Sequence, residues 1–151
     1  MKPLIVFAAS CLLLASFETG CGRPTEETKK AMSLQSELSQ LQKELWRILP
    51  NLNRAAGQID SIARREDKSA KMLAVDVQSA KEMIIAAFKA YDDQTWEIPP
   101  LDDSKGAIRA LEVDTGILKN ALAKTTAAIN KAHDVVGALD KGAVQSKTGK
   151  R

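Results

Sequence analysis

Cysteine, histidine and aromatic residues are scarce in this 151-residue chain. Both cysteines, Cys11 and Cys21, lie in the first 21 residues, so the remainder has no disulfide framework, no thiolate nucleophile and no cysteine-based metal site. Aromatic residues make up only 4% of the chain, against 44% for all hydrophobic residues. Because sheets favour Val, Ile, Tyr and Phe, this composition argues against a β fold and favours long packed helices.

The residue patterns that catalysis requires are also missing. His133 is the single histidine, and no second motif beside it makes it a haem ligand or a general base. The sequence has no glycine-rich phosphate loop, no paired histidines on a helix and no serine nucleophile elbow. The carboxylate pairs at 92–93 and 102–103 lack the ligand spacing of a calcium loop, and helix capping explains them better. The sequence therefore predicts a protein that is not an enzyme, with no catalytic residues, no metal and no cofactor.

The net charge of +3 is unevenly placed. Residues 1–20 carry one charge of each sign and residues 141–151 carry four positive charges, which leaves −1 for residues 21–140. Residues 141–151 have little apolar surface to bury, so we expect a basic, disordered tail. Such a tail is either simply solvated or binds lipid head groups or an anionic wall polymer. The export predicted below argues against nucleic acid as a partner.

The first 20 residues have the pattern of a secretory signal peptide. Lys2 supplies a positive charge, and residues 4–17 form an apolar run of fourteen residues. As a helix this run reaches about 21 Å, short of the ~30 Å hydrocarbon core of a bilayer. A cleaved signal peptide is therefore favoured over a membrane-spanning anchor.

The segment Glu18-Thr19-Gly20-Cys21-Gly22 resembles the cleavage site of bacterial lipoprotein precursors. In those precursors a small residue precedes a cysteine that is diacylated and becomes the mature N-terminus. Thr19 and Gly20 fit this pattern, whereas Glu18 stands where the family usually has an aliphatic residue. The resemblance covers the leader alone and implies lipidation at Cys21, with the protein anchored to a membrane of the cell envelope on the periplasmic side. Ordinary signal cleavage without lipidation is the alternative.

A heptad stripe runs through residues 34–62. Its apolar members recur in alternate steps of four and three residues: Leu34, Leu38, Leu41, Leu45, Ile48, Leu52, Ala55, Ile59 and Ile62. This is the seam of a coiled coil, in which each apolar side chain enters a hole on a facing helix. Thr25, followed by Glu26 and Glu27, predicts the start of this helix, because it can cap the first turn. Pro50 leaves the phase of the stripe unbroken, which favours one kinked helix over two separate ones.

A second stripe follows after a charged interruption at 64–68. Its members are Leu73, Val77, Ala80, Ile84, Ala87 and Tyr91. The spacing of eleven from Ile62 to Leu73 fits a stutter in one continuous helix over 26–92. It also fits a tight turn at 65–69 between antiparallel helices. Because the interruption contains neither Gly nor Pro, the pattern favours the continuous helix.

Two consecutive prolines mark a loop at 93–103. We expect Trp96, Ile98 and Leu101 to fold back over the end of the bundle. A partner-binding tip that includes Trp96 is the alternative interpretation.

A third stripe predicts the last helix, which Asp102 or Asp103 should cap. Its members are Ile108, Leu111, Thr115, Leu118, Leu122, Thr125, Ile129, Ala132, Val136 and Leu139. Gly137 and Gly142 flank the expected end of this helix.

In the continuous arrangement, the last helix folds back from the loop and leaves the beginning of the first stripe without a partner. The unpaired residues are Leu34, Leu38, Leu41, Leu45, Ile48 and Leu52. Fully burying a leucine contributes about 1.5–3 kcal/mol, so these exposed residues favour association. The sequence therefore predicts a homo-oligomer, or docking on a helical partner protein, through residues 34–52 with Trp96 as a further contact.

Together these patterns predict an all-α fold, either a helical hairpin or a three-helix coiled-coil bundle. The expected organisation is a signal peptide at 1–20, a lipidated tether at 21–28, a helical domain at 29–140 and the basic tail at 141–151. The first predicted function is that of an envelope lipoprotein acting as a helical scaffold or assembly subunit.

Two other functions remain open. A lipoprotein that links membrane to cell wall is one, because helical heptads with a basic end loosely resemble the major outer-membrane lipoproteins that attach through a terminal lysine. The chain ends instead in Arg151, and its proline loop interrupts the helix. A small periplasmic bundle that binds a ligand or cofactor is the other.

Overall fold

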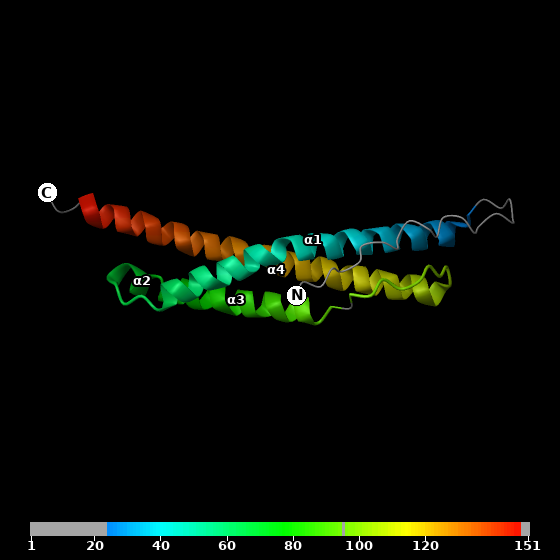
Figure 1. Ribbon diagram of the computed structural model, residues 1–151, viewed down its shortest axis with the longest axis horizontal. Helices are drawn as coiled ribbons and strands as arrows, with labels where there is room; N and C mark the ends of the chain where they lie inside the picture. The colour runs from blue at the N-terminus through cyan, green and yellow to red at the C-terminus, as the bar shows by residue number, and fades with distance from the viewer. Residues whose placement is uncertain (1–23, 95, 149–151) are drawn as a thin grey trace, which may run out of the picture.

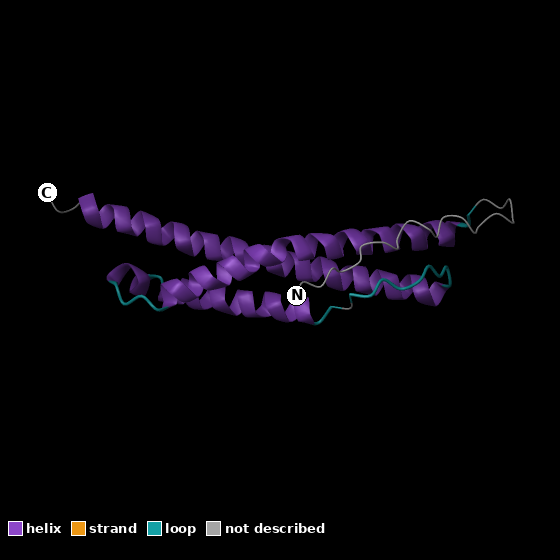
Figure 2. Ribbon diagram, viewed as in Figure 1, coloured by secondary structure: helices purple, strands orange, loops and turns teal. Residues whose placement is uncertain are grey.

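The computed structural model describes residues 24–94 and 96–148, without the side chains of residues 142–148. Within these residues all regular structure is helical (Figure 2) and consists of α1 (Glu26–Ala63), α2 (Lys68–Met72), α3 (Ala74–Asp92) and α4 (Lys105–Thr148). The long helices pack along one another, which confirms the predicted all-α bundle. The predicted signal peptide and Cys21 lie outside the described residues.

The first helix begins where the sequence predicts. The Thr25 hydroxyl accepts a hydrogen bond from the backbone N–H of Thr28 over 3.1 Å, and Glu26 and Glu27 occupy the first turn. Pro50 lies inside α1 and is exposed, so the carbonyl that loses its helical partner there can bind water. As the phase of the stripe predicts, α1 is one helix across Pro50.

The chain turns after α1, so the continuous helix favoured over 26–92 is wrong and the alternative turn is right. Arg64 ends α1, and Asp67 starts α2. The Asp67 carboxylate accepts hydrogen bonds from the backbone N–H of Ala70 over 3.0 Å and from Arg65 Nε over 2.7 Å. This capped turn needs neither Gly nor Pro, and it lets α3 pack back on the bundle.

α1 and α4 run parallel along the rod, whereas α3 runs in the opposite direction (Figure 1). Ion pairs join α1 and α4 in the same order along both helices. Lys30 Nζ lies 2.7 Å from Glu112 Oε1, and Lys119 Nζ lies 2.6 Å from Glu37 Oε1. The parallel arrangement follows from the turn after α1 and differs from the continuous helix favoured by the sequence, on which the last helix would run antiparallel to residues 26–92.

The connection between α3 and α4, here called the strap (residues 93–94 and 96–104), determines where α4 begins. It continues from the end of α3 to the far end of the rod (Figure 1). There Thr28 Oγ1 donates a hydrogen bond to Asp103 Oδ2 over 2.8 Å. A dozen extended residues can span about 40 Å. The loop predicted at 93–103 is therefore an extended strap, and α4 begins beside the start of α1.

The core divides into two clusters along the rod. In one half of the rod the long helices α1, α3 and α4 pack together, with the one-turn α2 at the end; this is the three-helix half. Its core consists of Leu52, Ala55, Ile59, Ile62, Ala70, Val77, Ala80, Ile84, Ala87, Ala128, Ala132, Val135 and Leu139. In the two-helix half, α1 and α4 pair through Leu38, Leu45, Leu111, Leu118 and Ala121. Among the described residues, the buried apolar side chains extend from Ala31 to Leu139, all within residues 22–151.

The stripe predicted to lack a partner is covered by α4. Its buried members are Leu38, Leu45 and Leu52, and its half-buried members are Leu34, Leu41 and Ile48. The prediction of an uncovered stripe was wrong because it placed the start of α4 beside the end of α3. The strap instead carries the chain on to the start of α1 before α4 begins. Without an uncovered stripe, the sequence offers no reason for docking through residues 34–52.

Ser104 caps α4, in place of Asp102 or Asp103. The backbone N–H of Ala107 donates to Ser104 Oγ over 3.3 Å, and Asp102 Oδ1 accepts from the backbone N–H of Ser104 over 2.8 Å. Asp102 thus shapes the turn before the helix, while the Asp103 carboxylate accepts the hydrogen bond from Thr28.

At its other end, α4 continues to Thr148, beyond the end expected at Asp140. The tail predicted to be disordered from 141 is therefore helical as far as Thr148. Gly142 costs a helix only about 1 kcal/mol relative to alanine and does not by itself end one.

Candidate functional surfaces

Trp96 lies at the junction of the two halves of the rod. It packs edge-on against Trp46, with ring centroids 5.6 Å apart, and against Tyr91, with centroids 4.8 Å apart. The expected folding over the end of the bundle is wrong: Trp96 is half-buried at this junction, and Ile98 and Leu101 of the strap remain 43% and 49% exposed. Trp96 thus joins the strap to α1 and α3 partway along the rod rather than covering its end.

Polar side chains hold the strap against α1. Gln35 Nε2 donates to the carbonyl oxygen of Pro99 over 2.8 Å, and Gln94 Nε2 donates to the carbonyl of Ala90 in the last turn of α3. Together with the bond from Thr28 to the Asp103 carboxylate, these contacts fix the strap where it begins, in its middle and where it ends. They orient backbone and expose no reactive group.

The titratable residues singled out in the sequence do not assemble into a site. His133 is exposed on α4, next to Asp134. In the described part of the chain, no three His, Cys, Asp or Glu side chains gather closely enough to hold a metal ion. Nor does any helix among those residues combine the length and apolar character needed to cross a bilayer.

The carboxyl group of Asp67 has a distinct environment at the turn after α1. Hydrogen bonds from the backbone N–H of Ala70 and from the Arg65 side chain hold its pKa below the ordinary value for aspartate. Because both donors stabilise the charged form, the carboxylate acts as a helix cap, and its role is structural.

A concavity of about 350 Å³ opens at the same turn. Its floor is apolar, with Ile62, Ala70 and Val77, and the charged side chains at its rim are Arg65, Lys71 and Lys81. Two of these three cations are already partnered, Arg65 with Asp67 at 2.7 Å and Lys81 with Asp60 at 3.3 Å. The concavity therefore offers little free charge for a ligand.

The outward side of α1 carries a surface that we call the basic face: Lys43, Trp46, Arg47, Pro50 and Arg54. Lys43, Arg47, Pro50 and Arg54 recur in steps of four, three and four, and Trp46 lies three residues after Lys43 and four before Pro50, which places all five on one side of the helix. All five are exposed, Trp46 by 60%. Among the described residues, none forms an ion pair with the three cations of this face.

The basic face was not predicted from the sequence, because its charges alternate with the apolar residues of the first stripe. The signal was present in the sequence: between residues 43 and 54 there are three cations and one acidic residue, Glu44, for a net charge of +2.

Comparison with known protein families, with curated proteins and with solved structures finds no match for this chain. Function must therefore be argued from the residues and their geometry. Of the residues predicted to act, Cys21 lies outside the described part, the apolar residues between 34 and 52 belong to the core, and Trp96 holds the junction.

Proposed function

We propose that this protein is a non-enzymatic lipoprotein of a bacterial envelope, anchored through an acylated Cys21 and acting as a helical scaffold at the membrane surface. The observation that carries the proposal is how soon the folded body follows the cysteine. Thr25 already caps α1, and the helix begins at Glu26. Residues 22–25 can span at most about 14 Å, so an anchor at Cys21 would hold the rod against the lipid.

The shape of the body supports a scaffolding role. The 44 residues of α4 extend for about 66 Å at the rise of an α-helix. The rod is held together by apolar side chains along its length, in two consecutive clusters. A long body of this kind suits the positioning of other molecules along a membrane better than the enclosure of a small ligand.

The anchor follows from the physics of acyl chains. Each buried methylene contributes about 0.8 kcal/mol, so a single chain binds marginally and two or more hold a protein firmly. Diacylation of Cys21, as in the lipoprotein precursors that the leader resembles, would supply the two chains that a firm anchor needs.

Metabolic labelling with a fatty acid tests the proposal. A bacterial host expressing the full chain should incorporate the label, and Cys21→Ser should abolish it. Cys11→Ser is the matched control, because it changes the other cysteine of the chain and should keep the label. Label that persists in Cys21→Ser, or that never enters the wild-type chain, would contradict the proposal.

A further inference from the structure

The basic face of α1 has the composition of a surface that lies on an anionic bilayer. Lys43, Arg47 and Arg54 have no ion-pair partner among the described residues, so their charge is available to a ligand. Trp46 is large and 60% exposed, and the amphipathic indole ring is favoured at the boundary between head groups and acyl chains. Cations beside this ring can meet anionic head groups while the indole reaches the same boundary.

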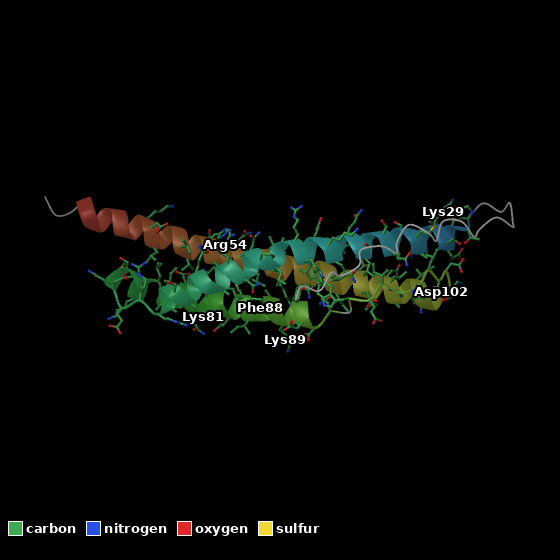
Figure 3. All side chains as sticks on the ribbon, viewed as in Figure 1. Lys29, Arg54, Lys81, Phe88, Lys89 and Asp102 are labelled. Carbon is green, nitrogen blue, oxygen red and sulfur yellow. The ribbon has the colours of Figure 1, made fainter. Side chains whose placement is uncertain are left out.

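The face is exposed, and of its five residues Trp46 borders the strap, at Trp96. Figure 3 shows Arg54 on the upper side of the rod and Lys81 and Lys89 of α3 on the lower side. The acidic residues Glu37 and Asp60 of α1 are occupied by ion pairs to α4 and α3, at 2.6 Å and 3.3 Å. Glu44 is the acidic residue left at the edge of the face.

We infer that the rod lies flat on the membrane, with the basic face of α1 against anionic phospholipid head groups. The inference rests on the proposed function in one respect, since it needs the N-terminal end of the rod to be held near the bilayer. If the rod stood upright, Lys43 would lie about 26 Å further along the helix than Glu26. That is well beyond the ~10 Å over which salt solution leaves charges unscreened. Lying flat brings all three cations into contact.

The expected gain follows from the number of cations. Each Lys or Arg near an anionic surface strengthens contact about fivefold, so three favour the flat orientation roughly 100-fold over the upright one, less the repulsion from Glu44. Zwitterionic lipid offers no such gain. The surface of α3 and α4 would then face away from the membrane, where other envelope components can reach it.

The test uses residues 22–151, which contain every buried apolar residue of the described part, with an N-terminal histidine tag bound to nickel-chelating lipid. Vesicles of phosphatidylcholine with and without phosphatidylglycerol provide the two surfaces. Trp96→Phe leaves Trp46 as the only tryptophan. We expect the Trp46 emission to shift to the blue, and brominated lipid to quench it, on vesicles that contain phosphatidylglycerol and not on phosphatidylcholine alone.

Charge reversal distinguishes binding through the basic face from attraction of the whole protein's positive charges to anionic vesicles. Lys43→Glu, Arg47→Glu and Arg54→Glu together should abolish the shift and the quenching, while circular dichroism stays helical. The matched control reverses three exposed lysines on the other helices, Lys71→Glu, Lys89→Glu and Lys124→Glu, and should keep both signals.

Three results would overturn the inference: equal loss in both triple variants, equal signals on the two kinds of vesicle, or binding to isolated cell wall in place of lipid. Because the tag replaces the acyl anchor, none of them bears on Cys21. Conversely, failure of fatty-acid labelling would leave the vesicle result standing.

Discussion

Leu45→Ala probes whether α4 of the same chain covers the leucine stripe of α1. The Leu45 side chain is 0% exposed and lies in the two-helix half between Leu38, Leu111 and Leu118. Removing a fully buried leucine side chain typically costs 2–5 kcal/mol, and we expect about 3 kcal/mol here. With a urea m-value of about 1.5 kcal/mol/M, the unfolding midpoint should fall by about 2 M. Urea unfolding followed by circular dichroism measures this shift.

The matched control is Leu101→Ala, which removes the same side chain from an exposed position. Leu101 is 49% exposed on the strap, so this change should cost less than about 0.5 kcal/mol. The unfolding midpoint of each variant should also be independent of protein concentration, because the covering helix belongs to the same chain. A cost below about 0.5 kcal/mol for Leu45→Ala, or a midpoint that rises with protein concentration, would refute the intramolecular packing.

Three further predictions follow from local features. Gly57→Ala should stabilise the protein by about 0.5–1 kcal/mol in urea unfolding, because a Cβ at this helical position meets nothing within 4 Å; a loss of stability would show a close approach there. The lowered pKa of Asp67 means that its charge stabilises the fold at neutral pH and ceases to do so as pH falls through the folded-state pKa. The difference in melting temperature between wild type and Asp67→Asn should therefore shrink on acidification, and a pH-independent difference would contradict this. Trp96→Ala should cost about 2 kcal/mol and speed proteolysis of the strap, whereas unchanged cleavage would show that the aromatic junction does not hold it.

Much of the helical structure could be predicted, because heptad spacing is a local property of the sequence. Thr25 as the first cap and an unbroken helix across Pro50 are both confirmed. The last stripe is confirmed in part: Leu122, Ile129 and Val136 are only half-buried, and its other predicted members are buried. Ala121, Ala128 and Val135 are buried as well. Ala128 and Val135 lie in the three-helix half, where α4 has two long neighbouring helices, and Ala121 lies in the two-helix half.

The turn after α1 could not be decided from spacing alone, since a stutter and a turn keep the stripes in the same phase. What decides it is the hydrogen bonding of the Asp67 side chain, which caps α2. An aspartate that follows a run of charges is a weak signal in a sequence. The absence of Gly and Pro at 64–68 favoured a continuous helix in the prediction. It did not exclude a turn, because the side-chain cap of Asp67 stabilises the turn without them.

The path of the strap accounts for the largest difference between the predicted and the observed fold, and it is the feature that the sequence indicates least. A dozen residues with two prolines fit a tight loop as well as an extended segment of about 40 Å. The burial of Leu38 and Leu45 by α4 and the contact of Thr28 with Asp103 favour the second arrangement, and both are properties of the whole fold. The path of the strap also decides which surface of α1 is exposed. The stripe predicted to bind a partner lies in the core, and the basic face remains on the outside of the helix.

Chemical cross-linking tests most directly whether α1 and α4 run parallel within one chain. Residues 22–151 contain no cysteine, so Glu37→Cys with Lys119→Cys creates a single pair of thiols, at positions whose native side chains meet at 2.6 Å. With a short bismaleimide, the parallel arrangement predicts a monomer cross-linked within itself at every protein concentration. Cross-linked dimers alone, or no cross-link between these positions in the folded protein, would contradict it.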